Sequence, residues 1–68
     1  MPEARTRPLP KGWTVKEDHA IGVTYFDDTG RMIVQHPYDS DAGLALAVGT
    51  YRSRCTPEQW QQFVEANK

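Results

Sequence analysis

The fold of this chain is decided by residues 21–36, which read IGVTYFDDTGRMIVQH. In Ile21–Phe26, the apolar side chains of Ile21, Val23 and Tyr25 recur at every second position. This period is typical of a β-strand. Residues 27–30 are Asp-Asp-Thr-Gly, a turn cluster that ends in a glycine able to adopt positive φ. Arg31–His36 is a second strand-like run, and Pro37 closes it. The stretch therefore predicts a β-hairpin.

The hydrophobic pattern also predicts which residues of the hairpin face each other. With a four-residue loop, Tyr25 pairs with Met32 and Val23 pairs with Val34, so these side chains share one face of the sheet. That apolar face consists of Ile21, Val23, Tyr25, Met32 and Val34. A register slipped by one residue would break up this set, and we therefore prefer the first register.

The opposite face of the hairpin mixes polar and apolar side chains. It carries Thr24, Phe26, Arg31, Ile33 and Gln35. An exposed phenylalanine and isoleucine on such a face indicate either a covering element or a binding surface. We predict a partner-binding site made of Phe26, Ile33, Arg31 and Thr24.

Two further segments are expected to extend the sheet. Residues 13–16, Trp-Thr-Val-Lys, predict a first strand whose tryptophan and valine point inward. In residues 44–54, leucine and valine first alternate with alanine, which fits a fourth strand with a bend at Gly49. Alanine and leucine are also strong helix formers, and Ser40 or Asp41 could cap a helix that ends before Gly49. We favour the strand and keep the helix as the alternative.

The C-terminal end predicts a helix. Thr56–Gln59 supplies an N-cap hydroxyl, a proline at the first helical position and a glutamine at the third, which together form a capping box. Trp60, Phe63 and Val64 follow at i, i+3 and i+4, and this apolar stripe is expected to pack on the sheet. The helix is expected to run to about Ala66.

These elements predict an α+β fold. A small antiparallel sheet of three to four strands packs against one C-terminal α-helix, and an extended N-terminal tail precedes it. Residues 1–11 hold three prolines and three basic side chains, which predicts a flexible, polyproline-like tail. Residues 12–68 are expected to form a single small domain.

Composition limits the functional classes. The chain has 68 residues, of which 38% are hydrophobic and 25% are charged, with a formal net charge of −1. These figures exclude a multi-domain enzyme and a histone-like polycation. The longest apolar run, residues 42–48, is far shorter than the ~20 residues of a membrane span, so no membrane association is expected. A single cysteine, Cys55, favours a reducing, cytoplasmic location.

A catalytic site would have to use Cys55. This thiol precedes a helix start and follows Arg54, both of which favour the thiolate, and His19 or His36 could act as its base. No third, orienting group is identifiable, and a small buried core residue is the alternative interpretation of Cys55. Cys55 and the two histidines also lack the close pairs of a zinc site. We therefore assign no catalytic residue, no metal and no cofactor.

Nucleic-acid binding is the alternative to protein binding. Arg31, Arg52, Arg54 and Tyr51 combine basic and aromatic side chains, as single-strand binders do. Residues 51–60, Tyr-Arg-Ser-Arg-Cys-Thr-Pro-Glu-Gln-Trp, are similar to the strand-to-helix corner of the positive-cofactor transcriptional coactivators. The resemblance implies a curved antiparallel sheet with a C-terminal helix that binds single-stranded DNA as a dimer. The chain departs from that family in lacking a lysine-rich sheet face.

A second resemblance is to the WW domains. Leu9–Trp13 reads Leu-Pro-Lys-Gly-Trp, and that family opens with the pattern L-P-x-G-W. Gly30–Pro37 resembles its G-R strand, with Ile33-Val34 in place of an aromatic pair and Gln35 in place of an asparagine. These departures fall on the proline-binding positions, so the function of the WW domains is not carried over.

The sequence thus predicts a small non-enzymatic protein-binding module, a regulator or inhibitor of a larger protein. Small regulators of this kind, including phage-encoded ones, have the same size and separated charge. Residues 1–16 carry four basic and one acidic side chain, whereas residues 17–41 carry six acidic and one basic. The expected partner is another protein, nucleic acid is the alternative, and a homodimer is possible because the sheet edges are open.

Overall fold

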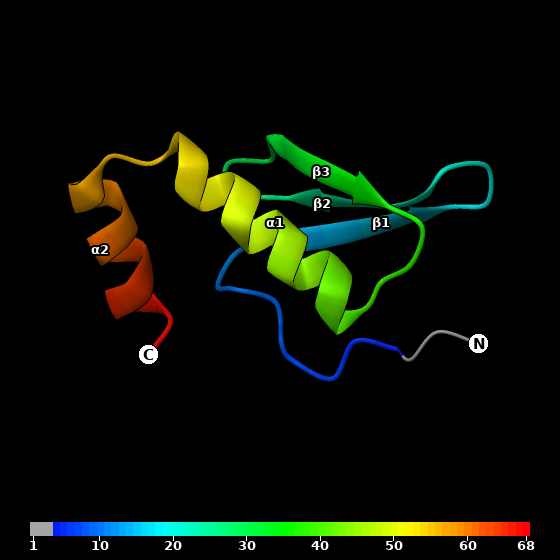
Figure 1. Cartoon of the computed structure of the whole chain (residues 1–68), viewed down its shortest axis with the longest axis horizontal. Coiled ribbons are helices and arrows are strands. Elements are labelled where there is room, and N and C mark those ends of the chain that lie inside the picture. The colour runs from blue at the N-terminus through cyan, green and yellow to red at the C-terminus, as the bar shows by residue number, and fades with distance from the viewer. Residues whose placement is uncertain (1–3) are drawn as a thin grey trace.

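The structure, a computed structural model, describes residues 4–68. Its three strands are β1 (Thr14–Asp18), β2 (Gly22–Phe26) and β3 (Met32–His36), and they form one antiparallel sheet in the order β1-β2-β3. Helix α1 (Asp41–Arg54) lies across one face of the sheet, and α2 (Pro57–Ala66) lies beyond the end of α1 (Figure 1). The predicted α+β fold is confirmed, with two helices following the sheet.

The hairpin of β2 and β3 forms as predicted, but its register was predicted wrongly. Tyr25 pairs with Val34, and Phe26 pairs with Met32, so Ile33 is the extra residue of a β-bulge. A bulge breaks the alternation of side chains along the strand that contains it. Ile33 consequently points into the core and is 3% exposed, whereas Met32, predicted to face inward, is 48% exposed.

The turn between β2 and β3 explains the shifted register. The Asp27 carboxylate accepts hydrogen bonds from Thr29 N, Thr29 Oγ1 and Arg31 N at 2.9, 2.6 and 3.1 Å. Asp27 N also donates to Arg31 O at 3.0 Å, which closes a loop of five residues in place of the predicted four. Burial alone would raise the pKa of Asp27, but the hydrogen bonds from Thr29 and Arg31 outweigh it and lower the pKa.

Residues 44–54, for which we favoured a strand, lie in α1. The Ser40 side chain caps the helix by accepting a hydrogen bond from Gly43 N at 3.1 Å. Leu44 and Ala47 are buried against the sheet, whereas Leu46 is 48% exposed. The alternation of leucine and alanine was therefore misleading, because Ala47 is completely buried whereas Leu46 points to solvent.

Helix α1 approaches the sheet most closely at Gly43. A Cβ atom placed there would lie 2.7 Å from Tyr25 Oη and 3.0 Å from Tyr38 O. Tyr25 is completely buried, and its hydroxyl donates to Asp39 Oδ1 at 3.1 Å. The side chains that form the core are Trp13, Val23, Tyr25, Ile33, Leu44 and Ala47. The absence of a side chain at residue 43 is what allows this core to close.

The capping box of α2 is confirmed. Gln59 N donates to Thr56 Oγ1 at 3.1 Å, and Thr56 N donates to Gln59 Oε1 at 2.8 Å. The prediction that Trp60 and Phe63 cover the sheet was wrong, because α1 is the helix that packs on the sheet. Every residue of α2 keeps part of its surface exposed. Neither helix within residues 4–68 has the length and hydropathy that a membrane crossing requires.

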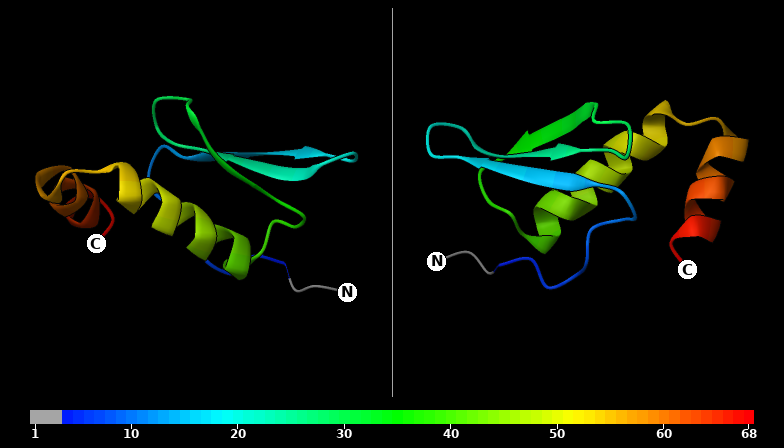
Figure 2. Two further views of the ribbon diagram at one scale, coloured as in Figure 1. Left: turned by 45° about the horizontal axis from the view of Figure 1, so that its top comes forward. Right: turned by 180° about the vertical axis from the view of Figure 1, so that it is seen from behind.

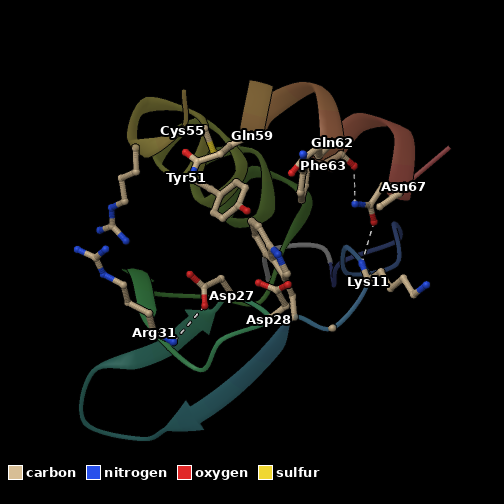
Figure 3. A pocket seen from close by; sticks show the side chains of 14 residues that line it. Lys11, Asp27, Asp28, Arg31, Tyr51, Cys55, Gln59, Gln62, Phe63 and Asn67 are labelled. Carbon is tan, nitrogen blue, oxygen red and sulfur yellow. Dashed lines mark hydrogen bonds between the residues drawn. The ribbon is translucent and has the colours of Figure 1, made fainter. Parts of the chain in front are cut away.

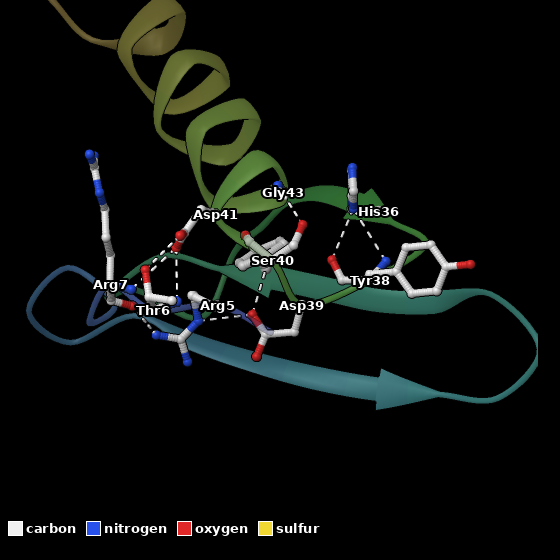
Figure 4. Close-up of polar contacts among 10 residues, drawn as sticks. Arg5, Thr6, Arg7, His36, Tyr38, Asp39, Ser40, Asp41 and Gly43 are labelled. Atoms are coloured by element: carbon white, nitrogen blue, oxygen red, sulfur yellow. Dashed lines mark hydrogen bonds and ion pairs between the residues drawn. The ribbon is translucent and has the colours of Figure 1, made fainter. Parts of the chain in front are cut away.

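The tail of residues 4–11 runs alongside the start of α1 (Figure 4). Arg5 Nε contacts Asp39 Oδ1 at 2.8 Å, and Arg5 N donates to Asp39 O at 3.0 Å. Thr6 donates to the Asp41 carboxylate through its backbone N at 2.9 Å and its hydroxyl at 2.6 Å. These contacts join the tail to the first turn of α1. Residues 1–3 of the predicted tail lie outside the described residues.

The contacts between Thr6 and Asp41 should depend on pH. The hydrogen bonds that Thr6 and Arg7 donate hold the pKa of Asp41 below its ordinary value. A lowered pKa means that the ionised carboxylate persists above the ordinary value and that the contacts are lost only as pH falls through the lowered value. We expect the amide chemical shift of Thr6 to stay constant from neutral pH to about pH 4 and to move below it. A midpoint at or above the ordinary aspartate pKa would contradict these contacts.

Candidate functional site

The four residues of the predicted partner-binding site do not form one surface. Ile33 lies in the core because of the bulge, and Thr24 is 8% exposed. Phe26 is half-buried, and Arg31 is exposed in the turn between β2 and β3. The expected exposure of Ile33 and Thr24 was wrong, so the surface predicted from the hairpin is not assembled.

The sheet face opposite α1 is nevertheless open. Viewed from the side, α1 lies under the sheet, and no helix formed by residues 4–68 covers the other face (Figure 2). Strand pairing puts two rows of side chains on this face, Thr14–Phe26–Met32 and Lys16–Thr24–Gln35. Thr24 is buried between its two long neighbours, and Met32 is the most exposed apolar side chain of the rows. The open face therefore carries mostly polar side chains.

A deeper feature lies where α2 meets the rest of the protein. Three aromatic rings pack together there: Trp13 before β1, Tyr51 in α1 and Phe63 in α2. Their centroids are 5.2 Å apart for Trp13–Tyr51, 5.7 Å for Trp13–Phe63 and 5.0 Å for Tyr51–Phe63. Such separations are favourable for aromatic pairs, and this contact holds α2 in place.

These rings form the floor of a groove of about 630 Å³ (Figure 3). We call it the terminal groove. Its floor is Trp13, Tyr51 and Phe63, and its rim includes Asp28, Arg31 and Gln62. The rim residues come from the turn between β2 and β3 on one side and from α2 on the other. The groove is thus built by segments far apart in the sequence.

Two charged side chains of opposite sign, Asp28 and Arg31, lie on the rim of the terminal groove. Within residues 4–68, neither the Asp28 carboxylate nor the Arg31 guanidinium has a hydrogen-bond or ion-pair partner. The Asp27 carboxylate, by contrast, accepts hydrogen bonds from Thr29 and from the backbone N of Arg31 within the turn. Arg54 is also held, since its guanidinium donates to the carbonyl oxygens of Met32 and Ile33 at 3.1 and 3.2 Å. Asp28 and Arg31 are therefore available to a ligand.

The terminal groove also contains the only cysteine of the sequence, Cys55. Cys55 is half-buried and ends α1, where its backbone N–H donates to Arg52 O at 3.0 Å. Burial raises the pKa of Tyr51, and the neighbouring Cys55 and Asp28 act in the same direction, so Tyr51 keeps its proton at neutral pH.

The structure does not bring Cys55 together with His36. His36 contacts the backbone of Tyr38 beside the first turn of α1 (Figure 4), whereas Cys55 lies at the other end of this helix. The twelve residue steps from Gly43 to the C-cap Cys55 correspond to a rise of about 18 Å along the helix. His19 lines a separate hollow with Glu17 and Asp18. Within residues 4–68, no three His, Cys, Asp or Glu side chains gather where they could hold a metal ion.

Three of the four predicted nucleic-acid-binding residues do meet. Arg31, Arg54 and Tyr51 all line the terminal groove. Arg52 lies elsewhere, with its guanidinium 4.9 Å from the centre of the Trp60 ring. The strand-to-helix corner implied by the resemblance to the positive-cofactor coactivators was wrong, because residues 51–54 form the last turn of α1.

Sequence reasoning missed Trp13, Phe63, Asp28 and Gln62 as members of one site. Trp13 was expected to point inward from the first strand and Phe63 to pack on the sheet, but an open groove between them was not expected. Asp28 was assigned to the turn alone. Its position on the rim depends on the five-residue loop, for which the hydrophobic pattern contains no signal.

Comparison with known proteins provides no relative from which a function could be transferred, since no protein-family model, no curated protein and no solved structure matches the chain. The function has to be inferred from the terminal groove and from the charges on its rim.

Proposed function

We propose that this protein is a small non-enzymatic protein-binding module, and that it regulates a larger protein by holding an extended segment of it in the terminal groove. The observation that supports this most strongly is the aromatic floor flanked by two free charges of opposite sign. Aromatic side chains are enriched at protein interfaces, and aromatic-lined grooves are a recurrent way to bind extended peptides.

The groove defines the chemistry of the bound segment. An aliphatic or proline side chain would pack on the rings of Tyr51 and Phe63, which keep part of their surface exposed. A basic residue of the segment would pair with Asp28, and an acidic one would pair with Arg31. The Gln62 amide can both donate to and accept from a peptide backbone. A segment with an apolar residue between opposite charges fits this arrangement.

Single-stranded nucleic acid is the second candidate ligand. It is favoured by one observation, the presence of Arg31, Arg54 and Tyr51 in the same groove. The acidic side chains of the groove argue against nucleic acid, because Asp27 and Asp28 also line it and would repel phosphate groups. The net charge of −1 provides little general attraction for a polyanion. The mixed signs of the rim therefore support a peptide.

Selection from a random peptide library on the full-length protein tests the proposal. We expect the selected peptides to carry a basic residue beside an apolar one. Asp28→Lys should weaken their binding about tenfold, because it replaces an attraction with a repulsion at the edge of the interface. Fluorescence anisotropy of a labelled peptide measures the change.

The matched control is Glu17→Lys, the same charge reversal on an exposed residue of β1. It should leave the affinity within about twofold of the original, since Glu17 does not line the terminal groove. The proposal fails if the library yields no binder or if Asp28→Lys binds the selected peptide as well as the original protein. A single-stranded oligonucleotide that binds, and binds more tightly to Asp28→Lys, would establish the second candidate.

A further inference from the structure

Helix α2 is held in place at its two ends and by one ring in between. At its start, a two-residue connection joins it to α1. In its middle, the ring of Phe63 packs on Trp13 and Tyr51. Just after its end, Asn67 bonds to Lys11 of the tail. Figure 1 shows α2 set apart from the sheet, and no residue of α2 is fully buried. A helix with so little burial depends on these few attachments for its position.

The connection between α1 and α2 has the geometry of a hinge. Cys55 (φ −90°, ψ 145°) and Thr56 (φ −69°, ψ 161°) both have extended backbones. Cys55 N donates to Arg52 O in α1, and Thr56 N donates to Gln59 Oε1 in α2. A rotation about the Cα–C bond of Cys55 therefore turns α2 without breaking either hydrogen bond. The contact of Arg52 with the Trp60 ring lies next to this pivot, where a rotation displaces side chains least.

The opposite end of α2 is fastened to the tail by a hydrogen bond, drawn in Figure 3. Asn67 Nδ2 donates to Phe63 O at 2.9 Å, which orients the Asn67 side chain. Its Oδ1 accepts from the backbone N of Lys11 at 2.8 Å, and we call this bond the latch. Lys11 and Asn67 are both exposed, so water can replace the latch when it breaks. The ten residues of α2 rise about 15 Å, and the latch thus lies where a rotation at the hinge has its largest effect.

We propose that α2 is a hinged arm of the terminal groove, and that the latch between Lys11 and Asn67 holds this arm closed. The arm supplies Phe63 to the floor of the groove and Gln62 to its rim. The remaining floor and rim residues come from the start of β1, the turn after β2 and α1. A rotation at the hinge separates these two sets of residues. The groove is therefore complete only while the arm is closed.

This inference concerns the regulation of the proposed binding site, and it rests on the proposed function where it assigns the bound segment to the closed state. Opening removes Phe63 from Trp13 and Tyr51, which costs two aromatic contacts and makes the open state the minor one. A segment that contacts Phe63 and Trp13 together can bind only the closed state. Its binding therefore shifts the remaining open molecules to the closed state.

The sequence offers a substitution that removes the latch without changing α2. Trp13 N donates to Pro10 O at 3.0 Å, which closes a turn with Lys11 second and Gly12 third. Gly12 has a φ of 83°, whereas the φ of Lys11 is not positive. These signs define a type II turn, in which proline is favoured at the second position. Lys11→Pro thus keeps the turn and removes the N–H donor of the latch. The matched control is Lys11→Ala, which removes the same side chain but keeps the N–H.

NMR relaxation dispersion of the ligand-free, full-length variants tests the inference. The ring resonances of Phe63 and Trp13 should report the exchange, because their contact is lost in the open state. We expect the ratio of open to closed molecules to be about fivefold higher in Lys11→Pro than in Lys11→Ala, the factor that one hydrogen bond typically contributes. Far-UV circular dichroism should be the same for both variants, since the arm turns as an intact helix.

Equal exchange in the two variants overturns the inference, and so does the absence of exchange in Lys11→Pro. A loss of helix in Lys11→Pro also overturns it, because α2 would then unfold instead of turning. A peptide selected for the terminal groove should suppress the exchange in both variants, and exchange that persists in the bound protein would contradict the role of the closed arm. If no peptide binds, the proposed function alone fails, because the ligand-free comparison uses no peptide.

Discussion

Replacement of Trp13 by alanine is expected to lower the free energy of unfolding by about 3–5 kcal/mol and to detach α2 from the rest of the protein. Trp13 is 6% exposed, and its ring contacts both Tyr51 of α1 and Phe63 of α2. Its loss leaves a cavity at the junction of the sheet and the two helices. A domain of 68 residues has little stability in reserve, so this change should unfold much of the population.

Urea denaturation followed by circular dichroism measures the loss, and the fluorescence of Trp60, the second of the two tryptophans, reports on α2. The control is Trp60→Ala. The Trp60 ring is only partly buried and stacks on Phe63 with centroids 5.1 Å apart, so its removal should cost about 1 kcal/mol. An equal cost for the two variants would contradict the view that Trp13 is the centre of the junction.

Two glycines of the same helix are expected to respond in opposite directions to alanine. Gly43→Ala should destabilise the protein by about 1–3 kcal/mol, because the added Cβ would lie 2.7 Å from the hydroxyl of the fully buried Tyr25. The second close atom, Tyr38 O at 3.0 Å, belongs to the backbone and cannot rotate away. The helix would have to move off the sheet to accept the new methyl group.

Gly49→Ala is the matched substitution, and it should stabilise the protein by about 0.5–1 kcal/mol. The added methyl group meets open space, and alanine loses less backbone entropy than glycine when the helix forms. Thermal unfolding of the two variants at low protein concentration measures both changes. If both substitutions stabilise the protein, α1 does not approach the sheet at Gly43 as closely as described.

The parts of the fold that the sequence predicted correctly depend on local signals. A turn after Phe26, the capping box at Thr56–Gln59 and a first strand, found at Thr14–Asp18 where residues 13–16 were expected, are each determined by neighbours in the chain. The α1 segment was predicted wrongly because its leucine-alanine pattern suits a strand and a helix about equally. The choice between them is made by the sheet, which needs one covering layer and has room for alanine at residue 47.

The candidate site was less accessible to sequence reasoning than the fold. The Asp27 turn lengthens the loop by one residue, and the resulting bulge turns Ile33 inward and Met32 outward. Because α1 covers the sheet, Phe63 packs on Trp13 and Tyr51 at the junction and not on the sheet. The terminal groove is thus a consequence of tertiary packing, and its charges, Asp28 above all, acquire their position from it.

Titration of the intact ¹⁵N-labelled protein with a peptide selected from the library tests the central claim most directly. We predict chemical-shift changes at the indole N–H of Trp13, at the backbone amides of Asp28 and Arg31, and at the side-chain amide of Gln62, all of which line the terminal groove. Changes confined to the open sheet face, at Lys16 and Met32, would contradict the account, because the peptide would then be bound by the surface opposite α1.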